Sequence, residues 1–168
     1  MRNKNTLKLA LASLLCAVAV VGSMFSFPVF GSKCSPIQHM VNVLCAVLLS
    51  ASYGTSAAFC AALIRNLCGL GSVLAFPGSI FGAFLSALVY KKTKSIPGAL
   101  IGEVVGTSIF GGLCAWPLAT LVLQVKEVAF YAYIMPFFIS TAAGSMLAGV
   151  LVFALEKSGA LGKIKELL

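Results

Sequence analysis

The sequence is poor in charged residues, and above all in acidic ones. Only 10% of its 168 residues are charged, and it has 4 acidic side chains, one histidine and one tryptophan. A soluble domain of ordinary composition has roughly 25% charged residues. Most of the surface of this chain therefore cannot face water. The scarcity of charge excludes a water-soluble enzyme, a nucleic-acid-binding protein and a disordered chain.

Hydrophobic residues make up 60% of the sequence, and the mean hydropathy is +1.05. A helix needs about 20 apolar residues to cross the hydrocarbon core of a bilayer. Six such helices would use about 120 residues and leave roughly 48 for loops and tails. The composition predicts an all-α integral membrane protein, built as one compact domain of six transmembrane helices over residues 1–168. No room is left for an ATPase domain.

Proline, glycine and basic residues interrupt the apolar runs and mark the ends of the predicted helices. The predicted spans are residues 7–25 with a continuation through 27–30, then 36–51, 55–68, 76–90, 97–123 and 128–155. A cationic tail follows the last span. The basic start and apolar run of residues 1–26 also fit a signal peptide, and we favour a first helix that is retained.

The basic residues lie at the ends of the spans and on one predicted side. Nine of them fall in the loops and tails of that side, namely Arg2, Lys4, Lys8, Lys91, Lys92, Lys94, Lys157, Lys163 and Lys165. The other side has only Lys33 and Lys126. The positive-inside rule then predicts that both termini lie in the cytoplasm and that the protein is in the cell membrane. This distribution indicates contact with the bilayer and argues against nucleic acid.

Small residues recur at every fourth position on several predicted spans. Such stripes are Gly98, Gly102 and Gly106, then Gly78, Gly82 and Ser86, then Ser140, Gly144 and Ala148. They let helix backbones approach closely in lipid, and we expect them to pack the bundle internally. The first span has two similar pairs, Ala12 with Cys16 and Ser13 with Ala17. These pairs indicate packing inside the bundle or docking of a partner helix, and spacing leaves both open.

Polar side chains inside the membrane are expensive, so each is a functional candidate. Gln38, His39 and Asn42 lie in the first turns of the second span, and their spacing puts them on one helix face. We expect this face to bind a ligand near the outer surface. Arg65 and Asn66 end the third span. There Arg65 either extends to the interface or binds a polar group of a substrate.

Glu103 is the only carboxylate within a predicted span. It lies about 9 Å along the helix from Pro97. This depth predicts a place in the inner half of the membrane, away from Gln38 and His39, and a secondary role as a ligand. Trp116 and Tyr131 lie near the outer ends of the last two spans, where they would anchor the interface or stack on a flat aromatic substrate. No spacing of residues predicts a metal site, a cofactor or a catalytic dyad.

Four segments of the chain together resemble the ThiW family. They are Pro36-Ile37-Gln38-His39-Met40-Val41-Asn42, then residues 64–72 with Arg65, Asn66 and Ser72, then residues 74–79, and finally Gly102-Glu103 with Gly106-Thr107. ThiW proteins are substrate-binding S components of energy-coupling factor (ECF) transporters. The resemblance implies a six-helix fold that captures hydroxyethylthiazole, the thiazole precursor of thiamine. It also implies assembly with a transmembrane coupling protein and two cytoplasmic ATPases.

The resemblance also implies a docking face. S components dock through an Ala-x-x-x-Ala pattern on the first span, whose nearest matches here are the pairs Ala12–Cys16 and Ser13–Ala17. The segments 34–36 and 69–79 contain glycine and proline and are plausible gates. Cys34 and Cys68 both fall in predicted outer loops, where they either form a disulfide or remain two free thiols.

Three alternative functions stay open at this point. An S component could take thiamine, hydroxymethylpyrimidine or another vitamin. A stand-alone channel or facilitator would need a polar pore lining, for which one chain has few residues. A small intramembrane enzyme would need His39 and Glu103 as its acid–base pair, and the predicted depths separate the two.

Overall fold

The computed structural model describes residues 4–30, 32–125 and 128–168, and helices make up most of them. The helices are α1 (Lys4–Gly22), η1 (Ser23–Phe25), α2 (Pro36–Leu48), α3 (Ala51–Leu67), α4 (Ala75–Thr93), α5 (Ile96–Val105), η2 (Gly106–Gly111), α6 (Gly112–Leu121), α7 (Ile134–Lys157) and α8 (Ala160–Leu167). Two short antiparallel strands, β1 (Phe27–Val29) and β2 (Ser32–Cys34), connect η1 to α2.

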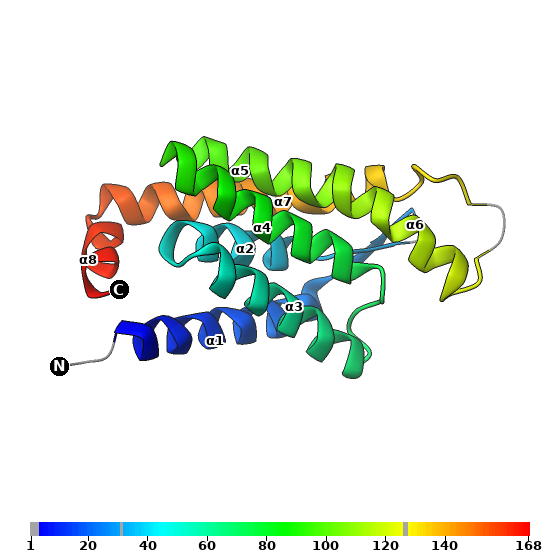
Figure 1. The fold of residues 1–168 in the computed structure, drawn as a ribbon, viewed down its shortest axis with the longest axis horizontal. Coiled ribbons are helices and arrows are strands. Elements are labelled where there is room, and N and C mark those ends of the chain that lie inside the picture. Colours follow the sequence, from blue (N-terminus) through cyan, green and yellow to red (C-terminus); the bar gives the residue numbers. More distant parts are fainter. Residues whose placement is uncertain (1–3, 31, 126–127) are drawn as a thin grey trace.

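The helices form an elongated bundle along one long axis (Figure 1). The start of α1 and the whole of α8 lie at one end, and α6 with the loop that follows it lies at the other. The segment Ile96–Leu121 is one continuous helix whose middle turns, η2, are π-helical. Within the described residues, three helices are long and apolar enough to cross a membrane, namely Lys4–Phe25, Ile96–Leu121 and Ile134–Lys157. The protein is therefore an all-α membrane protein, while the six-span count remains a prediction.

The largest difference from the predicted spans lies between α1 and α2. The first span was expected to continue through residues 27–30, but the chain leaves the helix and forms the β1–β2 hairpin instead. Pro28 explains the change, because proline has no N–H to donate and disfavours helical backbone at the preceding residue. Phe30 takes a positive φ of 46° in the turn between the strands. The predicted cationic tail also differs, since it contains helix α8.

The hairpin brings the chain back into the bundle. Along the axis of α7, α2 therefore begins beside a later turn of α7 and not beside its first residue. The backbone N–H of Ser35 donates to Ser140 Oγ at 2.9 Å. Ser140 is six residues into α7, which is about 9 Å along the helix axis. Helix α2 has only 13 residues. Its first turn therefore lies near the middle of the bundle rather than at an outer surface.

The small-residue stripes pack inside the bundle, as predicted. A Cβ atom on Gly102 would lie 2.8 Å from the carbonyl oxygen of Leu85, and one on Gly106 would lie 2.5 Å from that of Phe81. Both carbonyl groups belong to α4. Close backbone approach of this kind replaces the hydrophobic effect as a source of helix association in lipid. It fixes α5 and η2 tightly against α4.

Candidate functional site

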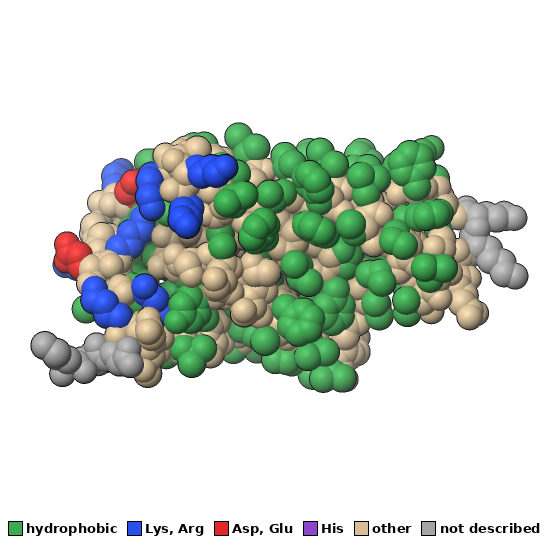
Figure 2. All heavy atoms as spheres, viewed as in Figure 1, with side chains coloured by type: hydrophobic (Ala, Val, Ile, Leu, Met, Phe, Trp, Pro, Cys, Tyr) green, Lys and Arg blue, Asp and Glu red, His purple; other side chains and the backbone are tan. Residues whose placement is uncertain are grey.

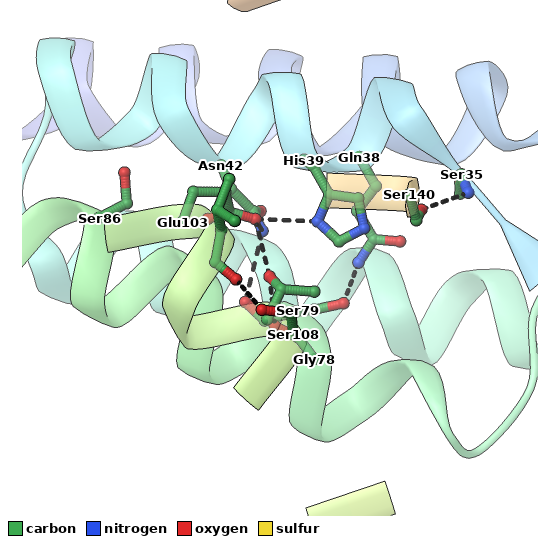
Figure 3. Close-up of polar contacts among 12 residues, drawn as sticks. Ser35, Gln38, His39, Asn42, Gly78, Ser79, Ser86, Glu103, Ser108 and Ser140 are labelled. Atoms are coloured by element: carbon green, nitrogen blue, oxygen red, sulfur yellow. Dashed lines mark hydrogen bonds and ion pairs between the residues drawn. The ribbon is translucent and has the colours of Figure 1, made fainter. Parts of the chain in front are cut away.

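Glu103 is the centre of a buried polar cluster between α2, α4 and α5 (Figure 3). Its Oε1 accepts hydrogen bonds from Asn42 Nδ2 at 2.9 Å and from Thr107 Oγ1 at 3.2 Å. His39 Nδ1 lies 2.9 Å from the same oxygen. A carboxylate oxygen can only accept, so Nδ1 is assigned the hydrogen of this bond. Three donors on one oxygen compensate for the burial of an acidic group that is fully shielded from solvent.

The cluster extends along one face of α2 to the N-terminal turns of α4. Gln38 donates to Ser79 Oγ, and Asn42 Nδ2 also approaches the Ser79 carbonyl oxygen at 3.4 Å. Ser79 Oγ itself donates to the carbonyl of Ala75 at 2.7 Å. The predicted common face of Gln38, His39 and Asn42 is thus confirmed, because all three side chains are buried and point between the same helices.

The predicted separation of Glu103 from His39 was wrong, because the two side chains are in contact. The estimate assumed that the second span starts at the outer surface, which would leave His39 far from a carboxylate in the inner half. The β1–β2 hairpin instead starts α2 near mid-bundle, and this brings His39 to the level of Glu103. The argument that separated these two residues as an acid–base pair therefore fails.

A small cavity opens beside this cluster. It has a volume of about 30 Å³ and is lined by Lys33, Ser35, Gln38, His39, Arg65, Ala75, Gly78, Ser79, Thr107, Phe137 and Ser140. A single water needs about 10–15 Å³ measured in this way. The cavity therefore holds only one or two waters in this closed state.

Arg65 is the least satisfied side chain that lines the cavity. It is 2% exposed, and its Nε and Nη1 atoms have no hydrogen-bond partner among the described residues. Of the two roles left open, extension to the interface is excluded by this burial. Desolvated charge without a partner is strongly unfavourable. The guanidinium is therefore a donor that a bound acceptor group would satisfy.

Asn66 and Ser72 are joined to each other near the end of α3. Asn66 Nδ2 donates to the carbonyl oxygens of Ala62 at 2.9 Å and of Ser72 at 3.0 Å. These bonds hold the loop between α3 and α4 against the end of α3. Neither residue lines the cavity. Their position indicates a role in shaping the loop.

The structure does not bring Trp116 or Tyr131 to the cavity. Trp116 Nε1 donates to the carbonyl of Val128 at 3.0 Å, and Tyr131 is 61% exposed and packs on Phe130. The aromatic side chain at the cavity is Phe137 of α7. Sequence reasoning missed it because twelve phenylalanines occur in the chain, and nothing in its spacing distinguishes this one.

Hydroxyl residues were also missed as part of the site. Ser79 and Ser140 line the cavity, and Thr107 both lines it and binds Glu103. Ser140 was assigned to a packing stripe, and Thr107 was named only as part of a segment that resembles the ThiW family. A usable signal was present, since each is a hydroxyl group within an apolar segment and needs a hydrogen-bond partner.

The four candidate docking residues of α1 divide into two pairs. Ala12 and Cys16 are buried in the bundle, whereas Ser13 and Ala17 are exposed. All four residues line a groove of about 360 Å³ between α1 and α3. All six cysteines are free, so Cys34 and Cys68 are two thiols rather than a disulfide.

Comparison with known proteins adds one finding to this geometry. The model of the ThiW family, described as thiamine-precursor transporter protein, matches residues 9–158. This range includes every residue of the polar cluster and of the cavity. Searches of curated proteins and of solved structures gave no match.

Proposed function

Because the chain belongs to the ThiW family of thiamine-precursor transporters, we propose that it is the substrate-binding S component of an ATP-driven ECF importer. The substrate we propose is hydroxyethylthiazole. One observation supports this proposal above the others, namely a buried cavity whose lining combines an unsatisfied arginine, neutral polar groups and one aromatic ring. Sites for small organic ligands are typically of this kind, with a few placed polar groups.

The lining matches the chemistry of a thiazole alcohol. The ring nitrogen and the hydroxyl oxygen of this ligand are acceptors, and Arg65, Lys33 and Gln38 supply donors around the cavity. The flat ring suits the face of Phe137. Glu103 does not line the cavity. In this proposal it orients His39 and Asn42 and does not contact the substrate.

Substrate entry requires the cavity to open, because its present volume of about 30 Å³ holds only one or two waters. Lys33 of β2 lines the cavity, and its Nζ joins the β1–β2 hairpin to the α3–α4 loop by donating to the Gly69 carbonyl oxygen at 3.3 Å. We propose that these two segments, which include the predicted gates, separate to admit substrate. A single exposed hydrogen bond is weak enough to be broken in each cycle.

The proposal places the energy source outside this chain. A transmembrane coupling protein and two cytoplasmic ATPases would drive transport, and the exposed residues Ser13 and Ala17 beside the α1–α3 groove are the proposed docking face. The His39–Glu103 pair is then structural, in keeping with a transporter family. Six spans with both termini in the cytoplasm complete the proposed arrangement.

Calorimetry on the purified protein tests the substrate. We expect hydroxyethylthiazole to bind tightly at one site, and thiamine and hydroxymethylpyrimidine to bind more weakly or not at all. Uptake of labelled thiazole should require the coupling protein and the ATPases together. Binding of thiamine or the pyrimidine in preference to the thiazole would contradict the substrate. Uptake by the chain alone, without ATP, would favour the facilitator alternative.

A further inference from the structure

A second and much larger cavity lies at the end of the bundle that holds α8. Its volume is about 540 Å³. The lining residues are Ala46, Val47, Leu49, Ser50, Ala51, Ser52, Ala87, Tyr90, Lys91, Lys94 and Lys165. None of them lines the cavity beside Glu103. The proposed substrate site therefore leaves this second cavity unexplained.

Three lysines converge on this cavity without acidic partners. Among the described residues, none of Lys91, Lys94 and Lys165 has a carboxylate oxygen within 4.0 Å, and the one ion pair present is that of His39 with Glu103. Lys165 Nζ donates to the Tyr90 hydroxyl at 2.6 Å. The ammonium groups of Lys165 and Lys94 lie 5.2 and 5.9 Å from the centre of the Tyr90 ring. Two ammonium groups thus lie close to Tyr90, and no carboxylate in the described part of the chain neutralises them.

The rest of the lining is of two kinds. Ala46, Val47, Leu49 and Ala87 form an apolar wall, and the exposed residues Ser50 and Ser52 add hydroxyl groups between α2 and α3. The end of the molecule that holds α8 is also where lysines gather, while hydrophobic side chains cover the rest of the visible face (Figure 2). The cavity therefore lies where the apolar surface of the bundle meets its cationic end.

We propose that this cavity binds the phosphate headgroup of an anionic phospholipid from the cytoplasmic leaflet. The lysines would neutralise the phosphate, the two serines would donate hydrogen bonds, and the apolar wall would receive the glycerol and the first methylenes of an acyl chain. Free phosphate would also bind the lysines and the serines, but it would leave the apolar wall uncovered. The combined lining therefore favours the lipid as the source of the phosphate.

A bound headgroup would join three parts of the fold. Lys91 lies in the last turn of α4 and Lys94 directly follows that helix, Lys165 belongs to α8, and Ser50 and Ser52 flank the first residue of α3. Without the lipid, the Lys165–Tyr90 hydrogen bond is the one side-chain hydrogen bond between α8 and α4 in the described part of the chain. The lipid would hold α8 beneath the bundle through several charge-assisted hydrogen bonds.

Native mass spectrometry of the full-length protein in detergent tests the proposal. The probes are phosphatidylglycerol and phosphatidylcholine with identical acyl chains, together with inorganic phosphate as a competitor. We expect one phosphatidylglycerol to bind at least about tenfold more tightly than phosphatidylcholine. Each lysine near an anionic headgroup contributes about fivefold in affinity. The double variant Lys91→Gln, Lys165→Gln should therefore lose roughly 25-fold.

Lys92→Gln is the matched control, because Lys92 is exposed on the same turn and does not line the cavity. It should bind phosphatidylglycerol as the unmodified protein does. Retained binding of hydroxyethylthiazole, or failing that an unchanged unfolding temperature, shows that the double variant is folded. Equal affinity for the two lipids, or equal loss in the double variant and the control, would overturn the proposal. Displacement of the lipid by micromolar inorganic phosphate would overturn the lipid as the source.

Discussion

At the scale of single residues, the two buried ionisable side chains Glu103 and Arg65 differ in how their hydrogen-bonding groups are satisfied. Glu103 has three donors on one oxygen, and its Oε2 has no partner among the described residues. Arg65 is buried as completely, yet its Nε and Nη1 donate to nothing in the described chain. The first arrangement compensates part of the charge of Glu103 within the protein. The second supports our proposal that Arg65 binds the substrate.

Replacing Arg65 by methionine separates binding from stability. The change removes a buried charge whose Nε and Nη1 make no hydrogen bond among the described residues, so the unfolding temperature should stay the same or rise. Affinity for hydroxyethylthiazole should fall by about tenfold to a hundredfold, because a hydrogen bond to a charged group is worth about 1.5–3 kcal/mol. Calorimetry and thermal unfolding in the same detergent measure the two effects.

Tyr131→Phe serves as the control for that experiment. Tyr131 is exposed and lies away from the cavity, so its hydroxyl should not affect affinity. If Tyr131→Phe weakened binding and Arg65→Met did not, the site would lie at the outer aromatic residues and our placement would fail.

Replacing Glu103 by leucine should damage the fold itself. It would leave His39, Asn42 and Thr107 without their shared acceptor, and removing one partner of a buried charged pair typically destabilises by about 3–5 kcal/mol. Glu103→Gln retains one acceptor oxygen and should therefore lower the unfolding temperature less than Glu103→Leu does. Thermal unfolding measures both variants, with Glu166→Gln on exposed α8 as the control. An unfolding temperature for Glu103→Leu equal to that of the control would show that the cluster does not stabilise the protein.

At the scale of elements, the π-helical segment η2 is the least expected feature. It begins three residues after Glu103 and contains Thr107, whose hydroxyl reaches both Glu103 Oε1 and the Gly78 carbonyl oxygen at 3.2 Å. π-Helical turns inside α-helices often occur at functional sites. Here the turn lies beside the cavity and against α4.

Gly106→Ala tests the close contact of η2 with α4. The added methyl group would lie 2.5 Å from the Phe81 carbonyl oxygen, so α4 and η2 must move apart. Overpacking of this kind destabilises by about 1–3 kcal/mol. Gly162→Ala on α8 meets nothing within 4 Å and should stabilise its helix by about 0.5–1 kcal/mol. Equal shifts in the unfolding temperatures of the two variants would contradict the packing described.

The proposed separation of the β1–β2 hairpin from the α3–α4 loop gives a kinetic prediction. Lys33→Met removes the hydrogen bond from the β1–β2 hairpin to the Gly69 carbonyl oxygen, so the covering segments should separate more often. We expect association of hydroxyethylthiazole to quicken by about threefold to tenfold. Dissociation should quicken at least as much, because Lys33 is also a proposed donor to the substrate. Stopped-flow binding measures the rates, and Lys163→Met on α8 is the control. Unchanged rates in Lys33→Met would show that opening occurs elsewhere.

At the scale of the whole molecule, charge is asymmetric along the bundle. The lysines gather at the end that holds α8 and the start of α1 (Figure 2). The β1–β2 hairpin and the α3–α4 loop, with exposed Cys68, are joined by the Lys33–Gly69 hydrogen bond. The positive-inside rule predicts that the lysine end lies in the cytoplasm, and in our proposal the substrate cavity then opens toward the outside.

Cysteine labelling in whole cells checks this orientation. In a background with Cys60 and Cys114 changed to serine, a membrane-impermeant maleimide should label exposed Cys68 from outside. Lys92→Cys should react only after permeabilisation. Burial raises the pKa of the Cys34 thiol, an effect that a hydrogen bond to Ser140 only partly offsets, so Cys34 should stay unlabelled. The opposite pattern for Cys68 and Lys92→Cys would invert the topology.

Much of the site could be read from the sequence because its spacing is local. Gln38, His39 and Asn42 share a face through the period of a single helix, and their burial follows from the cost of exposing polar groups to lipid. Trp116 and Tyr131 show the limit of such reasoning. An aromatic residue near a span end is as well suited to anchoring as to binding, and spacing does not distinguish the two.

The sequence by itself determined the class of the protein, because scarce charge and long apolar segments leave only a helical membrane bundle. It also determined the face of α2 that carries polar groups, and the glycine stripes that pack α5 and η2 against α4. Only the tertiary structure decided that Glu103 meets His39, that Nε and Nη1 of Arg65 have no partner among the described residues and that Phe137 lines the cavity. These are contacts between segments far apart in the chain. The positions of these residues along the bundle axis depend on where the β1–β2 hairpin returns the backbone into the bundle. Hydrophobic periodicity shows which face of a helix is buried but not how far along the bundle the helix starts.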